Sequence, residues 1–196
     1  NSGPGFGGSC FKKDILNLVY ICNHYSLFEV ANYWQKVLDI NNWQQKRFIN
    51  LIINRMFGTI SSKKIAILGF SFKANTNDTR ESPAIYICKK LIEEGAILNI
   101  YDPKVNFKQI YKDLQYNQPD IKNDKKWHYC EDVYETFTNV DAAIFLTEWD
   151  EFGNLNWPKI AKAMRKPAFI FDTRSIVNIK QVKDSGLKIW QVGYGY

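Results

Sequence analysis

Residues 64–102 read KIAILGFSFKANTNDTRESPAIYICKKLIEEGAILNIYD, and the spacing of their apolar residues changes twice. Two short apolar runs, Lys64–Gly69 and Ile97–Asp102, have the length and composition of strands inside a parallel sheet. Between them, Ser82-Pro83 is a typical helix start and Gly95 a typical helix end. The segment therefore predicts one β-loop-α-β unit.

The same alternation continues toward the C-terminus. Further strands are predicted near Trp127–Cys130, Ala142–Thr147, Ala168–Asp172 and Lys188–Val192. Helical stretches are predicted between them, near Val133–Thr138 and Pro158–Lys166. Strands that alternate with helices in this way predict an α/β fold, a Rossmann-like doubly wound parallel sheet.

Toward the N-terminus the apolar period becomes helical. One helix is expected from about Cys10 to Asn23, and Ser26–Glu29 matches a capping box that would start a second helix. That second helix would run to Gly58, about thirty residues against the ~11–12 of an average helix, although Asp39–Asn42 could kink it. We therefore expect two parts, residues 1–58 with the long helix and residues 59–196 with the sheet.

A glycine-rich loop precedes the first helix and ends at a cysteine, Gly3-Pro4-Gly5-Phe6-Gly7-Gly8-Ser9-Cys10. Ser9 is the expected N-cap, and the helix dipole would favour negative charge on the Cys10 sulfur in the first turn. Asp14 lies four residues on, hence on the same face, with Lys13 beside it. The pattern indicates a nucleophilic thiol, and the alternative that Cys10 is an ordinary small apolar residue stays open.

Ligands of doubly wound sheets bind at the carboxyl ends of the strands. Lys73 and Arg174 follow predicted strands there, so we expect them at an anion site. Asp102 could hold a ribose, but Asp102-Pro103 is better interpreted as a turn. The loop after the first strand has one glycine, Gly69, and not Gly-x-Gly-x-x-Gly, so by itself it is a weak dinucleotide signal.

Composition narrows the class of protein. The chain has 196 residues with a net charge of +6, and a basic cluster at Lys104–Lys126 is expected to be a solvated loop. We expect no nucleic-acid partner, because no recognition module is visible, and no membrane partner, because no apolar run approaches ~20 residues.

The four cysteines form no Cys-x-x-Cys pair, so we expect reduced thiols, no metal site and a cytoplasmic location. Because the chain starts at Asn1 beside the cysteine loop, we expect it to be a fragment of a longer protein.

The cysteine loop, with Phe11 and Lys13-Asp14 after it, resembles the active-site loop of the UDP-glucose 6-dehydrogenases. Five further segments also resemble the C-terminal half of a eukaryotic-type enzyme of this family: residues 66–73, 78–82, 100–104, 147–150 and 169–174. The resemblance implies that residues 59–196 form the UDP-sugar-binding domain. Residues 74–77, Ala-Asn-Thr-Asn, depart from the usual Lys-Asp-Thr-Gly of the family.

The resemblance implies an activity. The C6 alcohol of UDP-glucose would be oxidised in two hydride transfers to NAD, giving UDP-glucuronate. Cys10 would hold the intermediate aldehyde as a thiohemiacetal and then as a thioester. Asp14 would orient water or move protons, and Lys13 would lie near the nicotinamide, so Cys10, Asp14 and Lys13 are the expected catalytic residues.

It also implies binding residues. The expected substrate contacts are Gly3, Pro4, Gly5, Phe6, Gly7, Phe11, Phe72, Lys73 and Arg174. The expected NAD contacts within the chain are Cys10, Lys13 and Arg80. The family's own NAD-binding domain would precede residue 1, and the isolated chain is therefore expected to be inactive.

The long helix carries more aromatic and aliphatic positions than one neighbouring domain needs, and in the family that the chain resembles the equivalent helix forms the dimer core. We expect a homodimer, or a higher oligomer such as a hexamer; a lone connector covered by the rest of the protein is the alternative. Two other functions also stay open. One is a GDP-mannose or UDP-N-acetylmannosamine dehydrogenase, and the other is a non-catalytic nucleotide-binding assembly module.

Overall fold

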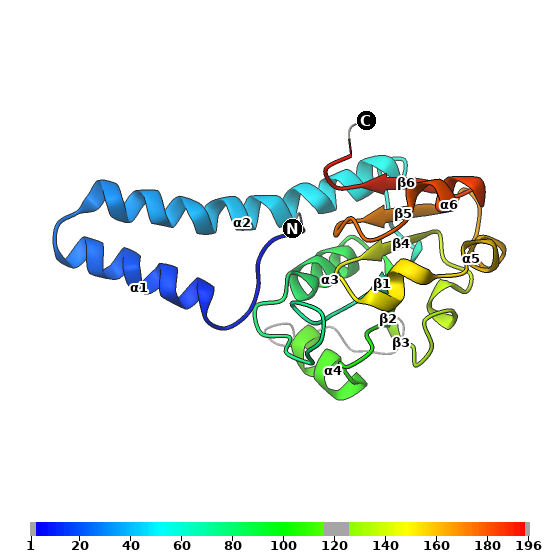
Figure 1. Cartoon of the computed structure of the whole chain (residues 1–196), viewed down its shortest axis with the longest axis horizontal. Coiled ribbons are helices and arrows are strands. Elements are labelled where there is room, and N and C mark those ends of the chain that lie inside the picture. The colour runs from blue at the N-terminus through cyan, green and yellow to red at the C-terminus, as the bar shows by residue number, and fades with distance from the viewer. Residues whose placement is uncertain (1–2, 116–125, 195–196) are drawn as a thin grey trace.

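A computed structural model describes residues 3–115 and 126–194 of the chain. Two long antiparallel helices, α1 (Phe11–His24) and α2 (Phe28–Arg55), form a hairpin that projects from one side of an α/β domain (Figure 1). The C-terminal half of α2 reaches back into that domain and packs Ile49, Ile52 and Met56 into its core. The division at residues 58 and 59 stays a prediction.

The domain is built on a six-stranded sheet in the order β3-β2-β1-β4-β5-β6. Every pairing is parallel. The strands are β1 (Lys64–Leu68), β2 (Ile97–Tyr101), β3 (Trp127–Tyr129), β4 (Ala142–Phe145), β5 (Phe169–Asp172) and β6 (Lys188–Gln191). The order reverses between β1 and β4, which is where a doubly wound sheet binds its ligands. The predicted fold class is confirmed.

Helices cover both faces of the sheet. One face carries α2, α3 (Pro83–Glu93) and α4 (Phe107–Gln115), and the other carries η1 (Glu135–Phe137), η2 (Asp150–Asn154), α5 (Trp157–Ala163) and α6 (Ile179–Asp184). In β1, Ile65 and Ile67 face the first core, whereas Ala66 and Leu68 face the second. A strand buried on both sides needs a continuous apolar run, which explains the sequence of β1.

The predicted long helix is confirmed, because α2 is continuous over 28 residues and does not break at Asp39–Asn42. Both expected N-caps are wrong. The cap positions of α1 and α2 are Cys10 and Leu27, and neither accepts a side-chain hydrogen bond. By contrast, Ser82 caps α3 as predicted, accepting a hydrogen bond from the amide of Ala84.

Two helices were not expected. α4 lies within the segment predicted to be a basic loop, of which residues 116–125 lie outside the described part, and it buries Ile110 and Leu114. α6 is a short helix capped by Asn178. The helix predicted over residues 133–138 is a three-residue 3-10 turn. Within residues 3–115 and 126–194, no helix combines the length and the apolar character needed to cross a bilayer.

Candidate active site

The glycine loop is held against the middle of α2. Asn41 makes two hydrogen bonds to Phe6, accepting from its amide at 2.7 Å and donating to its carbonyl at 3.2 Å. The side-chain amide of Gln44 donates to the carbonyl of Gly3 at 3.2 Å. Gly5 has a φ of +133° and lies so close to Asn41 that a Cβ would approach its Oδ1 to 2.7 Å. The loop therefore needs glycine at position 5.

The far end of the loop is held by the segment after β1. The amide of Gly8 donates to the carbonyl of Arg80 at 2.9 Å. At Gly7, a Cβ would lie 2.5 Å from the carbonyl oxygen of Glu81, which is closer than any side chain can approach. An ion pair between Lys12 and Glu81 at 2.7 Å joins α1 to the same segment. The loop is thus clamped between α2 and the β1–α3 connection.

A cleft of about 620 Å³ opens where the glycine loop, α2 and the carboxyl ends of the strands meet. It brings together most of the predicted substrate contacts, namely Gly3, Gly5, Phe6, Gly7, Phe72, Lys73 and Arg174. The rest of its lining is Val37, Ile40, Asn41, Gln44 and Glu148. Of the predicted contacts, Pro4 is buried, Phe11 is exposed, and neither lines the cleft.

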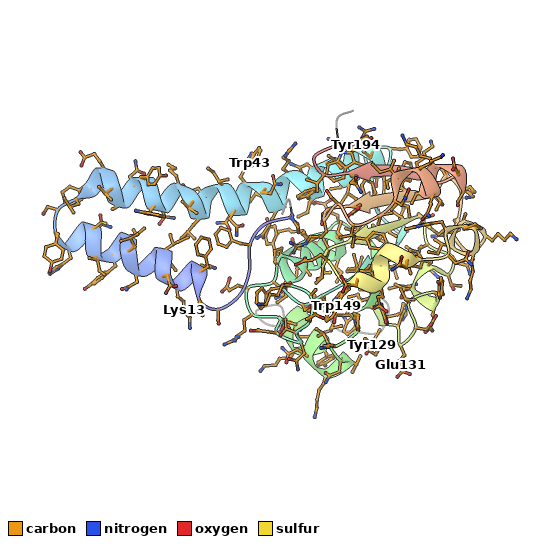
Figure 2. The ribbon with its side chains drawn as sticks, in the orientation of Figure 1. Lys13, Trp43, Tyr129, Glu131, Trp149 and Tyr194 are labelled. Carbon is orange, nitrogen blue, oxygen red and sulfur yellow. The ribbon has the colours of Figure 1, made fainter. Side chains whose placement is uncertain are left out.

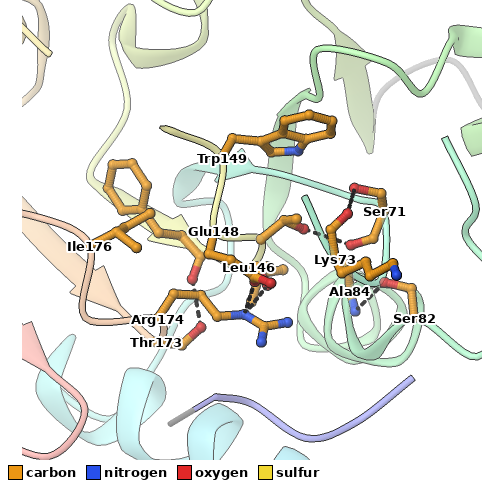
Figure 3. Close-up of polar contacts among 12 residues, drawn as sticks. Ser71, Lys73, Ser82, Ala84, Leu146, Glu148, Trp149, Thr173, Arg174 and Ile176 are labelled. Atoms are coloured by element: carbon orange, nitrogen blue, oxygen red, sulfur yellow. Dashed lines mark hydrogen bonds and ion pairs between the residues drawn. The ribbon is translucent and has the colours of Figure 1, made fainter. Parts of the chain in front are cut away.

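Arg174 is held in place by a hydrogen bond from its Nε. Its Nε donates to the carbonyl of Leu146 at 2.8 Å (Figure 3). The same nitrogen lies 3.2 Å from Glu148 Oε2, and this second contact is an ion pair that lacks the geometry of a hydrogen bond. The side chain is only 11% exposed, and this burial lowers the pKa of Arg174 from its usual value, while the charge of Glu148 opposes the shift. Both terminal nitrogens lack a hydrogen-bond partner in the described part of the chain. They remain available for an anion.

The other cation at the cleft, Lys73, comes from the β1–α3 connection. Its backbone carbonyl accepts from Ser71 Oγ at 3.0 Å, and its exposed ammonium lies 5.4 Å from the centre of the Phe72 ring. The Phe72 ring packs beneath Gly8, at a distance of 3.0 Å from the position of a Cβ there. Two cations on different connections thus border one partly apolar cleft.

Asp102 organises this edge of the sheet without facing a ligand. It is buried, and its Oδ2 accepts from the amides of Phe70 and Ser71 and from the indole of Trp149. Its Oδ1 accepts from the amides of residues 104 and 105, which is an Asx turn. The turn interpretation is therefore confirmed, and the carboxylate is fully used inside the protein.

Cys10 lies at the start of α1, exposed and outside the cleft lining. Its Sγ is 3.7 Å from Ser9 Oγ, and its carbonyl accepts from the amide of Asp14 at 2.9 Å. Asp14 and Lys13 are exposed, and the Lys13 side chain points away from α2 (Figure 2). Phe11 packs edge-to-face on Phe6 at 4.7 Å, which joins the cysteine turn to the part of the loop that lines the cleft.

The β1–α3 connection carries one of the predicted NAD contacts, Arg80. The β1–α3 turn does not fit the pyrophosphate of a dinucleotide, because Gly69 packs against Thr147, where a Cβ would approach to 2.4 Å. Arg80 is exposed, and its backbone carbonyl lies beside the loop that contains Cys10, where it accepts from the amide of Gly8. Its guanidinium pairs with Asp78 through two nitrogens at 2.9 and 2.6 Å, and this contact lowers the pKa of Asp78.

Two side chains at the site, Asn41 and Gln44, were missed from the sequence, and they bind a loop 35 and 41 positions away. Glu148, which contacts Arg174, follows a predicted strand at the same edge of the sheet. The available signal was the spacing of Val37, Asn41 and Gln44 at i, i+4 and i+7, which places polar and apolar residues on one helix face.

Two family models match the chain. The UDP-binding domain of the UDP-glucose/GDP-mannose dehydrogenase family matches residues 66–179, and the central domain of the same family matches residues 1–43. The chain belongs to this family.

Relatives with assigned names agree with this assignment. The chain is 47% identical to UDP-glucose 6-dehydrogenase 2 of Arabidopsis thaliana and 48% identical to UDP-glucose 6-dehydrogenase of Drosophila melanogaster, over 98% of its length in each case. It spans 42% and 41% of these relatives. A UDP-glucose dehydrogenase structure from Pyrobaculum islandicum superposes with a TM-score of 0.71 at 25% identity, covering 96% of this chain and 38% of that one.

Proposed function

We propose that the chain is the C-terminal part of an NAD-dependent UDP-glucose 6-dehydrogenase and that its cleft binds the nucleotide sugar. The observation that carries the proposal is the convergence of Lys73, Arg174 and the glycine loop on one cleft at the topological switch point. The sequence identity of 47% and 48% to proteins named UDP-glucose 6-dehydrogenase supports the choice of substrate.

The two cations would bind the diphosphate. Arg174 has its Nε fixed by Leu146, so its terminal nitrogens can donate to phosphate oxygens without reorganisation. Lys73, on the β1–α3 connection, would add a second positive charge beside Arg174, which follows β5. Phe72 and Phe6 would supply apolar wall, and the glycine loop would let backbone approach the sugar closely. Arg174 would set the position of the ligand, and Lys73 would mainly raise its affinity.

Cys10 is proposed as the nucleophile. Its sulfur would add to the C6 aldehyde while the aldehyde oxygen takes a proton, and this thiohemiacetal would hold the aldehyde until the second oxidation makes a thioester. Water would then cleave the thioester, releasing the acid and returning the thiol. Asp14, one turn further along α1, would exchange protons with that water. NAD, held in part by Lys13 and Arg80, supplies the hydride acceptor when it is bound.

Assembly and location belong to the same proposal. The surface of the hairpin exposes Tyr20 on α1 and Tyr33 and Trp43 on α2, each more than half exposed, and Trp43 points away from α1 (Figure 2). We propose that a second copy covers this surface in a homodimer, and that dimers can assemble further into a hexamer.

A cytoplasmic location is proposed from four free cysteines, three of them buried.

The test is a calorimetric titration of the chain with UDP-glucose and, in parallel, with GDP-mannose. We expect UDP-glucose to bind, and Lys73→Ala to bind at least about tenfold more weakly, because a charge-assisted contact is lost. Lys162→Ala, which removes an exposed lysine of α5, is the matched control and should bind as the wild type does.

Preferential binding of GDP-mannose would overturn the proposed substrate. The same titration on the full-length protein distinguishes a site that needs the remaining half from a site that does not bind UDP-glucose at all. The chain alone should produce no NADH from UDP-glucose and NAD, and a normal rate would contradict the proposal that it is only part of the enzyme.

A further inference from the structure

The glycine loop has no secondary structure between Gly3 and Ser9, yet the cleft depends on its shape. A glycine-rich segment loses much conformational entropy when it becomes ordered, so fixed contacts must hold it. Its hydrogen bonds to side chains come from one helix, α2, through Asn41 and Gln44.

Asn41 is chemically suited to this position. A carboxamide offers an acceptor and a donor on one planar group, and here both are used on the two backbone groups of Phe6. Aspartate would lose the donor, and an aliphatic residue would lose both contacts. Asn41 itself lines the cleft, so the group that shapes the loop also faces the ligand space.

The loop also joins this clamp to the cysteine. Phe6 packs on Phe11, which directly follows Cys10 in the first turn of α1. A change in the backbone at Phe6 therefore reaches both the cleft wall and the turn that presents the thiol.

We propose that Asn41 is a positioning residue, and that its two hydrogen bonds to Phe6 set the loop geometry required for nucleotide-sugar binding. Gln44 is the secondary anchor, at Gly3. The role in binding rests on the proposed function, whereas the role in holding the loop does not. The neighbouring Asn42 is exposed and makes no hydrogen bond to the described loop residues, so it provides a matched control.

The experiment compares Asn41→Ala with Asn42→Ala in the whole chain by hydrogen exchange of residues 3–9, by melting temperature and by titration with UDP-glucose. In Asn41→Ala, we expect loop amides to exchange at least about tenfold faster and UDP-glucose to bind about tenfold more weakly. Asn42→Ala should match the wild type in both. Both variants should keep the wild-type melting temperature, because the loop lies outside the two core clusters.

Equal hydrogen-exchange rates of the loop amides in Asn41→Ala and Asn42→Ala would overturn the inference, whether or not the affinity for UDP-glucose changes. Faster exchange with unchanged UDP-glucose affinity would overturn the role in binding. Faster exchange in a protein whose wild type binds no UDP-glucose would support the clamp and overturn the proposed function instead. If Asn41→Ala does not fold, Gln44→Ala removes the single bond to Gly3, and it should show the same two effects at smaller size; wild-type behaviour there would overturn the inference.

Discussion

Replacing Asp102 with alanine should cause one of the largest losses of stability in this chain. The carboxylate is 3% exposed and accepts six hydrogen bonds, from the amides of residues 70, 71, 104 and 105, the hydroxyl of Ser71 and the indole of Trp149. It joins the ends of β1 and β2 to the segment after β4.

The magnitude follows from the donors left behind. Five of the six donors are in buried residues, and the Ser71 hydroxyl among them keeps the carbonyl of Lys73 as a partner. The four left without a partner are the amides of Phe70, Ser71 and Val105 and the Trp149 indole. Each buried donor without a partner costs ~1–3 kcal/mol, and water entering the space of the lost carboxylate would recover part of this. We expect the free energy of unfolding to fall by about 5 kcal/mol. Asp102→Asn keeps one acceptor oxygen and should lose roughly half as much.

The assay is equilibrium unfolding in urea. With a slope of ~2–3 kcal/mol per molar, the midpoint of Asp102→Ala should fall by about 2 M, at an unchanged slope. Asp184→Ala is the control, because Asp184 is exposed at the end of α6, and it should change stability by less than ~0.5 kcal/mol. A loss below ~1 kcal/mol for Asp102→Ala would refute the reasoning, since it would mean that the carboxylate does not hold these connections together.

Three further outcomes are expected. Iodoacetamide should modify Cys10 much faster than the three buried cysteines, and Cys10→Ser should abolish the fast phase; equal labelling of all four would contradict the structure. Burial raises the pKa of the Cys88 thiol, so the unfolded chain loses this proton first, and stability should fall as pH rises above ~8.5, by at most ~1.4 kcal/mol per pH unit. Unfolding of Cys88→Ala at pH 8 and pH 10 should show a smaller fall than the wild type, and an identical fall would count against this. Lys12→Ala should change stability by less than ~0.5 kcal/mol, because its ion pair with Glu81 is exposed; a loss above 1 kcal/mol in urea would contradict that estimate.

The fold could be predicted because its signals are local and repeated. Each strand is a short apolar run, and Ser82 and Pro83 define a helix start through contacts within three residues. α4 was missed although Phe107, Ile110, Tyr111 and Leu114 have helical spacing, because the many lysines around it were interpreted as a solvated loop. Its apolar face, and not its overall charge, decided the structure.

The site could be predicted only in part. Lys73 and Arg174 line the same cleft because strand ends in a parallel sheet converge, and their role in binding stays a prediction. Asn41 could not be assigned, since its partner Phe6 is 35 residues away and an amide inside a helix carries no sign of a distant contact. The predicted caps failed because the helices begin one residue later than expected, so that Cys10 and Leu27, and not Ser9 and Ser26, occupy the N-cap positions.

The continuity of α2 has one more consequence, which concerns chain length. Its C-terminal half is fixed in the sheet core by Ile49 and Ile52, while its middle turn presents Asn41 to the glycine loop. Inserting or deleting one residue between these points would rotate Asn41 by about 100° and shift it by about 1.5 Å, turning its amide away from Phe6. Insertions and deletions should therefore be absent from this stretch among functional relatives, even where its side chains vary. This stretch of α2 should therefore accept substitutions but not a change in the number of its residues.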